Sequence, residues 1–353
     1  MTNTVLVTST AAGTGKTAVA IALGCIARDR GSDVGYMKPK GTTLQTRVGK
    51  VLDTDPLLAQ EVLDLDEAIE TMEPVVYSST FLKEVIRRSE STEAIRASVT
   101  SAYDRIANGR DLVVVDGDAG WSPGRAIRLT DRDIADLLDT KVILVAPYRD
   151  IFGIDEILAT AEGFGDRFAG VLFNAISEPD RDELESEIIP YLTANDIDVL
   201  GVLPRERLLF TVTVADLATE IGAEVVTSCP MDERVSRFSV GAMSSDAALG
   251  HFRRSQDTVV VTGGDRSGIQ AAALEAPGVR ALVLTGGLRP DSPIVSKAEE
   301  RNVPIMLVTG ETLHTIERIE AVIGTGRVRD PDEIAVVRSL LDQHADLSGL
   351  IGA

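Results

Sequence analysis

Short apolar runs alternate with longer amphipathic stretches along most of the chain. Apolar runs bounded by glycine or polar residues are typical of strands buried on both faces of a parallel sheet, and the stretches between them are long enough for crossover helices. This alternation predicts an α/β fold, a parallel sheet with helices on both faces. In the N-terminal part the strand candidates are 5–8, 33–37, 112–116, 142–146, 170–173 and 199–202, and the helix candidates include 134–138, 153–162 and 181–195.

A second α/β series follows in the C-terminal part and predicts a smaller α/β domain. Between the two series, residues 211–242 have no strong strand pattern. We therefore divide the chain near residue 212, into domains of residues 1–212 and 213–353. We expect the domains to pack together, because no low-complexity linker separates them. The strand candidates of the second series are 258–262, 281–285 and 305–308, and its helix candidates are 267–275, 294–301, 311–323 and 332–344.

The turn after the first predicted strand carries the strongest chemical signal. Residues 9–17 read Ser-Thr-Ala-Ala-Gly-Thr-Gly-Lys-Thr, between an apolar strand and a helical stretch. Amide groups of such a turn, together with the positive end of the helix dipole, bind polyphosphate. In this phosphate loop (residues 9–17), Lys16 is expected to reach the β- and γ-phosphates and Thr17 to ligate Mg²⁺. The other predicted nucleotide contacts are Thr10, Gly13, Thr14 and Gly15; the alternative is an ordinary strand-to-helix turn with an exposed lysine.

Further polar residues follow the neighbouring strands. Asp116 ends the strand 112–116, Lys38 follows the second strand, and Asp55 lies in a short acidic loop. Because the carboxyl ends of parallel strands meet at one sheet edge, we expect Asp55 and Asp116 to complete a Mg²⁺ site with Thr17. Lys38 is expected to meet phosphate or a substrate carboxylate. The structural alternative is that a carboxylate at a strand end caps a helix.

The charge and composition of the chain limit the kinds of partner and the cellular location that we expect for it. The 353 residues carry 35 Lys and Arg against 55 Asp and Glu, a net charge of −20, which argues against a nucleic-acid partner. The acidic residues are spread along the chain, which favours adaptation to a salty cytosol over recruitment of basic partners. We expect a cytoplasmic, halophilic protein without a membrane span, because no apolar run approaches the roughly 20 residues that a span needs. The spacing of the two cysteines and three histidines indicates neither a disulfide framework nor a metal site, and there is no glutaminase-like Cys–His pair.

Several motifs together resemble dethiobiotin synthetase over the N-terminal domain. They are the phosphate loop, Lys38-Pro39, Asp116-Gly117, and the runs 170–174 and 200–204. The chain is still more similar to the dethiobiotin-synthetase-like region of long phosphotransacetylases. The resemblance implies that Lys16, Thr17, Asp55 and Asp116 hold a Mg²⁺-nucleotide, ATP or another, and that Asn174 meets the base. Two features depart from the family: residues 116–120 read Asp-Gly-Asp-Ala-Gly instead of Glu-Gly-Ala-Gly-Gly, and Lys40 adds a positive charge.

The second domain is similar to the DRTGG domain. It contains the run Thr-Gly-Gly-Asp-Arg-Ser-Gly at 262–268 and a second Thr-Gly-Gly at 285–287. If the strands before these turns are parallel and adjacent, both turns lie at the carboxyl edge where open α/β sheets bind ligands. They would then form a pocket for a small anionic metabolite; the alternative is two tight packing turns in which Asp265 and Arg266 pair with each other. The predicted pocket residues are Gly264, Asp265, Arg266 and Gly287.

Three functional hypotheses remain open. The first is a regulatory protein that binds Mg²⁺-ATP, and whose second domain binds a small metabolite or forms a homodimer. The second is an ATP-dependent ligase or carboxylase, with Lys16 and Lys38 as catalytic residues and Lys38 orienting a carboxylate. The third is a dimerisation module beside a degenerate phosphate loop. In long phosphotransacetylases the acyl-transfer domain follows the DRTGG domain, and the sequence ends at Ala353, so we expect that this chain does not make acetyl phosphate itself.

The acidic composition generates a prediction about salt. A chain at −20 repels itself in dilute buffer, and the Debye length falls from about 10 Å at 0.1 M to about 3 Å at 1 M salt. We expect the melting temperature, followed by circular dichroism, to rise markedly between these concentrations. A melting temperature that does not change with salt concentration would instead favour the recruitment of basic partners as the explanation of the acidic residues.

Overall fold

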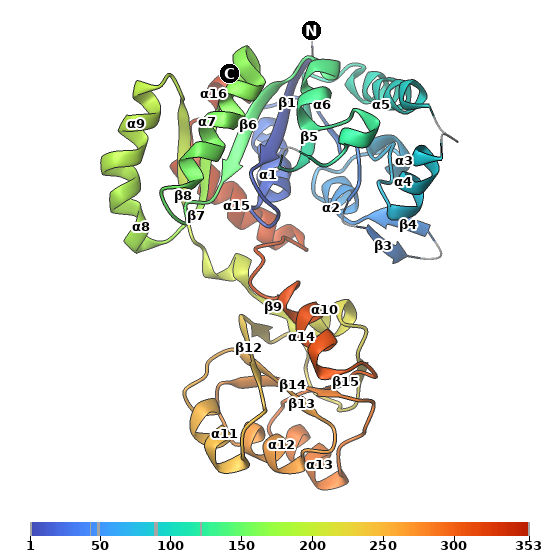
Figure 1. The fold of residues 1–353 in the computed structure, drawn as a ribbon, viewed down its shortest axis with the longest axis vertical. Helices are drawn as coiled ribbons and strands as arrows, with labels where there is room; N and C mark the ends of the chain where they lie inside the picture. The colour runs from blue at the N-terminus through green and yellow to red at the C-terminus, as the bar shows by residue number, and fades with distance from the viewer. Residues whose placement is uncertain (1, 43, 48–49, 88–90, 121, 352–353) are drawn as a thin grey trace. The chain divides into compact units, whose positions relative to one another are not determined.

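The computed structural model describes residues 2–351 except 43, 48–49, 88–90 and 121. It divides into two compact units (Figure 1). The first unit comprises Met1–Glu206 and Val328–Ala353, and the second unit comprises Arg207–Arg327.

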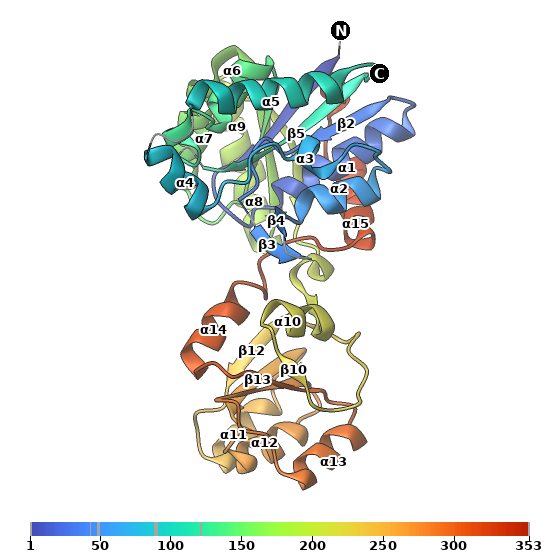
Figure 2. The same ribbon diagram turned by 90° about the vertical axis from the view of Figure 1, so that its right-hand side faces the viewer.

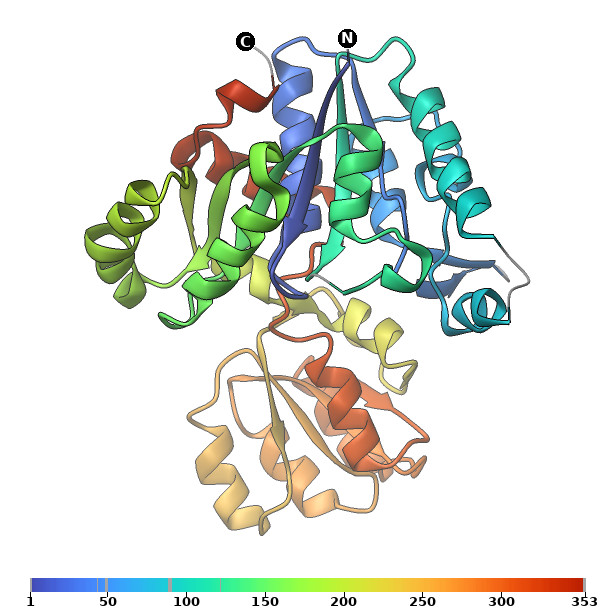
Figure 3. The same ribbon diagram turned by 45° about the horizontal axis from the view of Figure 1, so that its top comes forward.

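A six-stranded parallel sheet forms the centre of the first unit, and it confirms all six strands predicted there. The strand order is β2-β5-β1-β6-β7-β8, so β1 lies in the middle of the sheet (Figure 3). The neighbouring strands β1 and β5 are buried over nearly their whole length, which explains why their sequences are continuous apolar runs. The strands are β1 (Asn3–Ser9), β2 (Val34–Met37), β5 (Leu112–Ala119), β6 (Lys141–Ala146), β7 (Phe168–Ile176) and β8 (Val199–Pro204).

Helices cover both faces of this sheet, as predicted (Figure 2). On one face α1 (Lys16–Asp29) packs against β1, β2 and β5 with a row of buried small and branched residues. On the other face α5 (Thr92–Ala107) and α6 (Asp131–Leu138) share an apolar core with β1 and β5. The carboxyl ends of β1, β2 and β5 all reach the same edge, because the three strands run parallel.

The segment between β2 and α5 adds elements that the sequence did not indicate. A short antiparallel hairpin, β3 (Leu44–Arg47) and β4 (Lys50–Asp53), leads into α2 (Asp55–Val62). Two further helices follow, α3 (Ile69–Met72) and α4 (Ser79–Ile86). This segment supplies side chains to the candidate site described below.

Two further helical segments of the first unit are α7 (Gly153–Phe164), which was predicted, and a broken helix after β7. The predicted helix 181–195 is divided into α8 (Glu178–Glu183), a π-helical turn (Leu184–Ile188) and α9 (Ile189–Ala194). Pro190 has no amide hydrogen to continue the α-helical ladder, which accounts for the irregular turn before it.

The C-terminal segment differs from the predicted division, which assigned 213–353 to the second domain. Helix α15 (Pro331–His344), predicted as 332–344, packs against α1 and β8 of the first unit, and α16 (Ser348–Ile351) follows it. The Asp346 amide donates to the Leu200 carbonyl at 2.8 Å. The apolar stripe of α15 buries Ile334, Val337 and Leu341. Such a stripe requires an apolar partner but does not identify it, so the sequence could not assign this helix to a unit.

The second unit contains a five-stranded sheet in the order β10-β15-β14-β13-β12. The predicted strands are β13 (Thr258–Gly263), β14 (Val279–Thr285) and β15 (Ile305–Leu307), all parallel to β12 (Arg237–Val240), whereas β10 (Glu224–Val225) is antiparallel. One face packs against α11 (Ser245–Phe252), α12 (Ser267–Leu274) and α13 (Ser292–Glu300), and the other against α10 (Val214–Glu220) and α14 (Thr312–Glu320).

The segment 211–242 contains more strand than its pattern suggested. Besides β10 and β12 it holds β11 (Arg234–Val235), which pairs with β9 (Val212–Thr213). Strands of two to four residues are too short to show a hydrophobic period.

Candidate functional site

The phosphate loop connects β1 to α1 at the carboxyl edge of the first sheet. Gly13 and Gly15 both have positive φ angles, 73° and 88°. Gly15 is the residue before the first turn of α1, and it adopts the left-handed conformation that glycine accepts without strain. Thr10 and Thr14 lie within the same loop. All predicted loop contacts therefore surround the start of α1, where amide groups and the helix dipole favour an anion.

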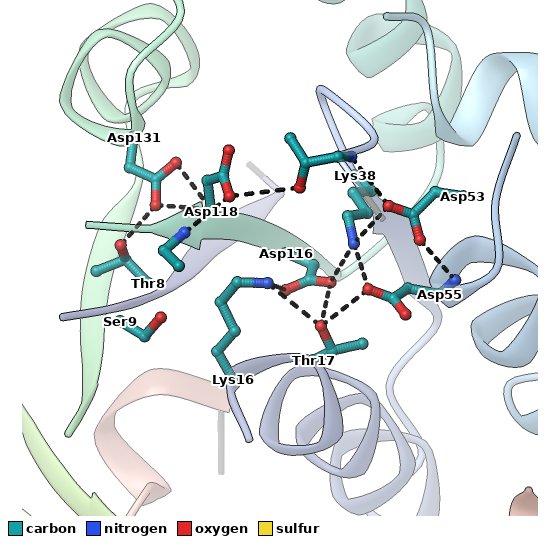
Figure 4. A network of polar contacts seen from close by, with 12 residues as sticks. Thr8, Ser9, Lys16, Thr17, Lys38, Asp53, Asp55, Asp116, Asp118 and Asp131 are labelled. Carbon is teal, nitrogen blue, oxygen red and sulfur yellow. Dashed lines mark hydrogen bonds and ion pairs between the residues drawn. The ribbon is translucent and has the colours of Figure 1, made fainter. Parts of the chain in front are cut away.

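The buried carboxylate of Asp116 is the centre of the site (Figure 4). Its Oδ1 lies 3.2 Å from the Lys16 ammonium, and its Oδ2 accepts a hydrogen bond from the Thr17 hydroxyl at 2.9 Å. The Tyr36 hydroxyl also donates to Oδ2, at 3.0 Å. The described contacts of Asp116 thus involve side chains of the site, which is not the pattern of a helix cap.

The three predicted metal-binding residues lie together. The Thr17 hydroxyl is 3.3 Å from Asp55 Oδ2 and 2.9 Å from Asp116 Oδ2. This set of oxygen donors suits Mg²⁺, which usually takes one or two carboxylates and completes its shell with phosphate and water. Within the described residues no group of three or more His, Cys, Asp or Glu side chains is arranged to hold a metal alone. The residues therefore fit a Mg²⁺ ion that is shared with a nucleotide.

Lys38 is buried between three carboxylates. Its side chain is 2% exposed, and it forms ion pairs with Asp53 at 3.1 Å, with Asp55, and with Asp116 at 3.7 Å. Burial alone would lower the pKa of Lys38, but the three carboxylates outweigh it and raise that pKa above its ordinary value. Lys38 is therefore a charged ammonium that neutralises this edge. Burial and Asp116 raise the pKa of Tyr36 as well, so Tyr36 is a neutral donor.

Two acidic residues support the site: Asp53, which belongs to the acidic loop that also carries Asp55, and Glu73, which was not predicted. Asp53 accepts hydrogen bonds from the backbone amides of Thr42 and Asp55, both at 3.0 Å, and so fixes the start of α2. Glu73 in turn accepts from the Asp53 amide at 3.1 Å. Burial raises the pKa of Glu73 to about 7. Nothing in the sequence around Glu73 or Tyr36 connects them to the phosphate loop, so only the fold could reveal them.

A second cluster, which we call the Lys40 cluster, lies at the same edge. It consists of Lys40, Asp118, Asp131 and Thr8. The Lys40 ammonium is 3.3 Å from Asp118 and 3.6 Å from Asp131. Asp131 also accepts from the Thr8 hydroxyl at 2.5 Å and from the Asp118 amide (Figure 4). The two departures from the dethiobiotin synthetase pattern, Lys40 and Asp118, therefore bind each other, while Asp131 was not predicted.

Asn174 lies at the end of β7 and contacts the phosphate loop itself. Its side-chain amide donates to the Thr14 carbonyl at 2.7 Å. The base contact that the resemblance implies for Asn174 stays a prediction.

In the second unit, the two Thr-Gly-Gly turns share one edge of the sheet. Strands β13 and β14 are parallel neighbours, as predicted, and the Gly264 amide donates to the Thr285 carbonyl at 3.1 Å. The Gly287 amide donates to the Val308 carbonyl at 3.0 Å. Asp265 is exposed, and so is Arg266. A binding pocket formed by Gly264, Asp265, Arg266 and Gly287 remains a prediction.

The contacts of Arg266 test the alternative in which the two turns only pack and Asp265 pairs with Arg266. One guanidinium nitrogen of Arg266 donates to the Gly241 carbonyl at 3.0 Å. No ion pair between Asp265 and Arg266 occurs in the part of the chain that the structure describes, so the mutual pairing that the alternative requires is not seen there. Buried Gln270, which was not predicted, donates to the carbonyls of Gly263 and Gly264, both at 3.0 Å.

Comparisons with known proteins cover nearly the whole chain. Residues 3–213 match the family described as AAA domain, and residues 216–322 match the DRTGG domain. A phosphate acetyltransferase of Haemophilus influenzae is 22% identical over 98% of this chain and 52% of its own length. The chain thus spans about half the length of this relative.

Two further relatives each match one part of the chain. An ATP-dependent dethiobiotin synthetase of Aromatoleum aromaticum is 26% identical over 54% of this chain and 85% of its own length. A solved structure of the CBS and DRTGG domains of Clostridium perfringens pyrophosphatase is 19% identical over 44% of this chain and 69% of its own, with a TM-score of 0.28. Among the described residues, no helix has the length and apolar character that a membrane crossing requires.

The position of Asp116 generates a prediction about metal dependence. Asp116→Asn keeps the size of the side chain but removes the charge that a metal ion would bind. We expect it to weaken nucleotide binding in the presence of Mg²⁺ and to leave binding in EDTA nearly intact, as measured by calorimetric titration. Asp139→Asn is the control, because Asp139 is exposed and pairs with Arg167 away from the site. A lower melting temperature with unchanged Mg²⁺ dependence would identify Asp116 as a structural residue.

Proposed function

The chain belongs to the AAA domain family, and from that premise we propose that it binds Mg²⁺-ATP at the phosphate loop and acts as a nucleotide-dependent regulatory protein. The observation that carries this proposal is the convergence of Lys16, Thr17 and Asp55 on the buried carboxylate of Asp116. A degenerate loop would not need to keep a cation on the Asp116 carboxylate and a hydroxyl between the two carboxylates of Asp55 and Asp116.

Binding requires these residues to exchange partners. Lys16 neutralises Asp116 in this structure, and the loop leads directly into the start of α1. When triphosphate binds, Lys16 moves from Asp116 to the phosphate oxygens, which releases Asp116 toward the metal side of the site. Mg²⁺ bound there would neutralise phosphate charge and connect Thr17 and Asp116 to the nucleotide. We expect Asn174 to contact the base, as the resemblance implies.

The second unit provides a separate surface for a regulatory partner. We propose that its carboxyl edge binds a small anionic metabolite through Arg266 and the glycine turns at Gly264 and Gly287. Arg266 is exposed, and only one of its guanidinium nitrogens is occupied by a carbonyl in the described contacts. A guanidinium has five N–H donors in a fork that matches a carboxylate or phosphate.

Homodimer formation through the same edge is the second candidate role. Met243, Leu288 and Leu313 are exposed, and each follows a different parallel strand of the second sheet. Exposed apolar side chains that gather at one edge are typical of a protein interface rather than a small-molecule site.

The ligase hypothesis is less well supported. An ATP-dependent ligase would use Lys38 to orient a substrate carboxylate, but Lys38 is enclosed by three carboxylates of the chain itself. The neighbouring cation, Lys40, is held by Asp118 and Asp131. A substrate carboxylate would have to displace these acidic side chains. In the proposed regulatory role the cation that changes partner is Lys16, which pairs with Asp116 at 3.2 Å, and no substrate carboxylate has to reach Lys38 or Lys40.

The nucleotide proposal is tested by calorimetric titration with ATP, GTP and ADP, with and without Mg²⁺, followed by a phosphate-release assay. Lys16→Ala removes a charged contact worth roughly 1.5–3 kcal/mol, so the Kd for ATP should rise by about ten- to a hundredfold. Lys141→Ala is a matched control, because Lys141 is an exposed lysine at the opposite end of β6. ATP binding that is unchanged in Lys16→Ala would refute the proposal. Phosphate release that depends on an added carboxylate would favour the ligase.

The role of the second unit is tested with Arg266→Ala in the full-length chain. We expect this variant to lose the stabilisation that small anions such as phosphate confer in a thermal-shift assay, or to lose dimerisation in light scattering, while its affinity for ATP stays that of the wild type. Arg253→Ala, at the exposed end of α11, is the control. If Arg266→Ala behaves as Arg253→Ala in both assays, the edge of the second sheet has neither role.

A further inference from the structure

The end of β7 is joined to the phosphate loop by a single side chain. Asn174 donates from Nδ2 to the Thr14 carbonyl at 2.7 Å, and the two residues are 160 positions apart in the sequence. The amide packs so closely over the loop that a Cβ at Gly15 would lie 2.4 Å from Nδ2. Asn174 and the loop therefore fit together only if position 15 is glycine.

The backbone around Asn174 is shaped for this contact. Ala175 has a φ of 61°, in the left-handed region that is strained for a residue other than glycine. The register between β7 and β8 also shifts between Phe173 and Ile176. Irregularities of this kind re-aim a side chain at the end of a strand, and they are frequent next to functional sites. Here the re-aimed side chain is Asn174.

The orientation of the Thr14 carbonyl, which accepts the hydrogen bond from Asn174, also determines the orientation of the Gly15 amide. The Thr14 C=O and the Gly15 N–H belong to one planar trans peptide, so they point in opposite directions. A donor that holds the carbonyl on the Asn174 side turns the Gly15 amide away from Asn174. The Gly15 carbonyl accepts the first hydrogen bond of α1, from Val19 at 3.0 Å, so the next peptide is fixed as well.

We propose that Asn174 is a positioning residue for the phosphate loop: it fixes the Thr14–Gly15 peptide so that the Gly15 amide is already oriented for phosphate before ligand arrives. The inference rests on the proposed nucleotide binding and adds to it a role that does not involve the base. In the part of the chain that the structure describes, Thr14 is the hydrogen-bond partner of Asn174. The second amide hydrogen and Oδ1 remain for a ligand. One side chain thus connects the base end of a nucleotide to its phosphate end.

A ligand without a base separates the two roles of Asn174. Wild-type protein and Asn174→Ala are titrated with Mg²⁺-ATP and with Mg²⁺-tripolyphosphate. If Asn174 positions the loop, the variant binds both ligands more weakly, by about two- to tenfold, the effect of one net hydrogen bond. If Asn174 only contacts the base, tripolyphosphate affinity is unchanged and the positioning role is overturned. If wild-type protein binds neither ligand, the nucleotide proposal fails and this inference with it.

A second measurement does not depend on any ligand. Hydrogen exchange of the ligand-free protein, followed by mass spectrometry, should be faster in Asn174→Ala over the loop peptide that contains Gly15. A base contact cannot change exchange in the absence of nucleotide, so unchanged exchange would overturn the proposal. Asn195→Ala is the matched control, because the Asn195 amide donates to the Tyr191 carbonyl at 2.8 Å on the exposed end of α9. It should alter neither exchange in the loop nor affinity for either ligand.

Discussion

Burial of the Asp116 carboxylate is the constraint on which the candidate site depends. Asp116 is on β5. It binds Lys16 and Thr17 at the start of α1, Tyr36 within β2, and Lys38 directly after β2. Removing one partner from such a cluster leaves an uncompensated buried charge, which typically costs about 3–5 kcal/mol. The cluster therefore fixes the relative positions of three neighbouring strands' carboxyl ends. It also means that ligand binding at this edge must be an exchange of partners, since an added charge would otherwise be unbalanced.

The local elements of this site could be predicted from the sequence, but their supporting contacts could not. The loop 9–17 and the strand before it contain their own signals, and the parallel sheet then requires Asp116 and Lys38 to share its edge. Glu73 acts through Asp53, and Asp131 acts through Asp118, each from an element separated by intervening structure. A sequence pattern identifies the apolar face of an element but not the element that covers it. Helix α15 illustrates the same limit, because its period was predicted correctly while its partner was not.

Short strands and residues with strained backbone angles could not be predicted from the sequence either. The strands between 211 and 242 are two to four residues long, and hydrophobic periodicity needs a longer window. The left-handed conformation of Ala175 has no signal, because alanine is not a residue that favours it. Such conformations persist only where surrounding contacts impose them. Ala175 directly follows Asn174, whose side chain is bonded to the phosphate loop.

In both units a side-chain amide bonds the backbone of a glycine turn at the carboxyl edge of the sheet. The side chains around the two turns differ, and this difference is the basis for proposing a different ligand for each unit. Asn174 holds the carbonyl of Thr14, and Gln270 holds the carbonyls of Gly263 and Gly264. In the first turn the donor on the Thr14 carbonyl turns the Gly15 amide away from Asn174, whereas in the second turn the Gly264 amide donates to the Thr285 carbonyl. The first turn is followed by a lysine, a hydroxyl and nearby carboxylates that suit a metal-bound triphosphate. The second has an exposed arginine and no comparable carboxylate cluster among the described residues, so it suits an anion without a metal. This difference is why we propose a nucleotide for the first unit and a smaller anion or a protein partner for the second.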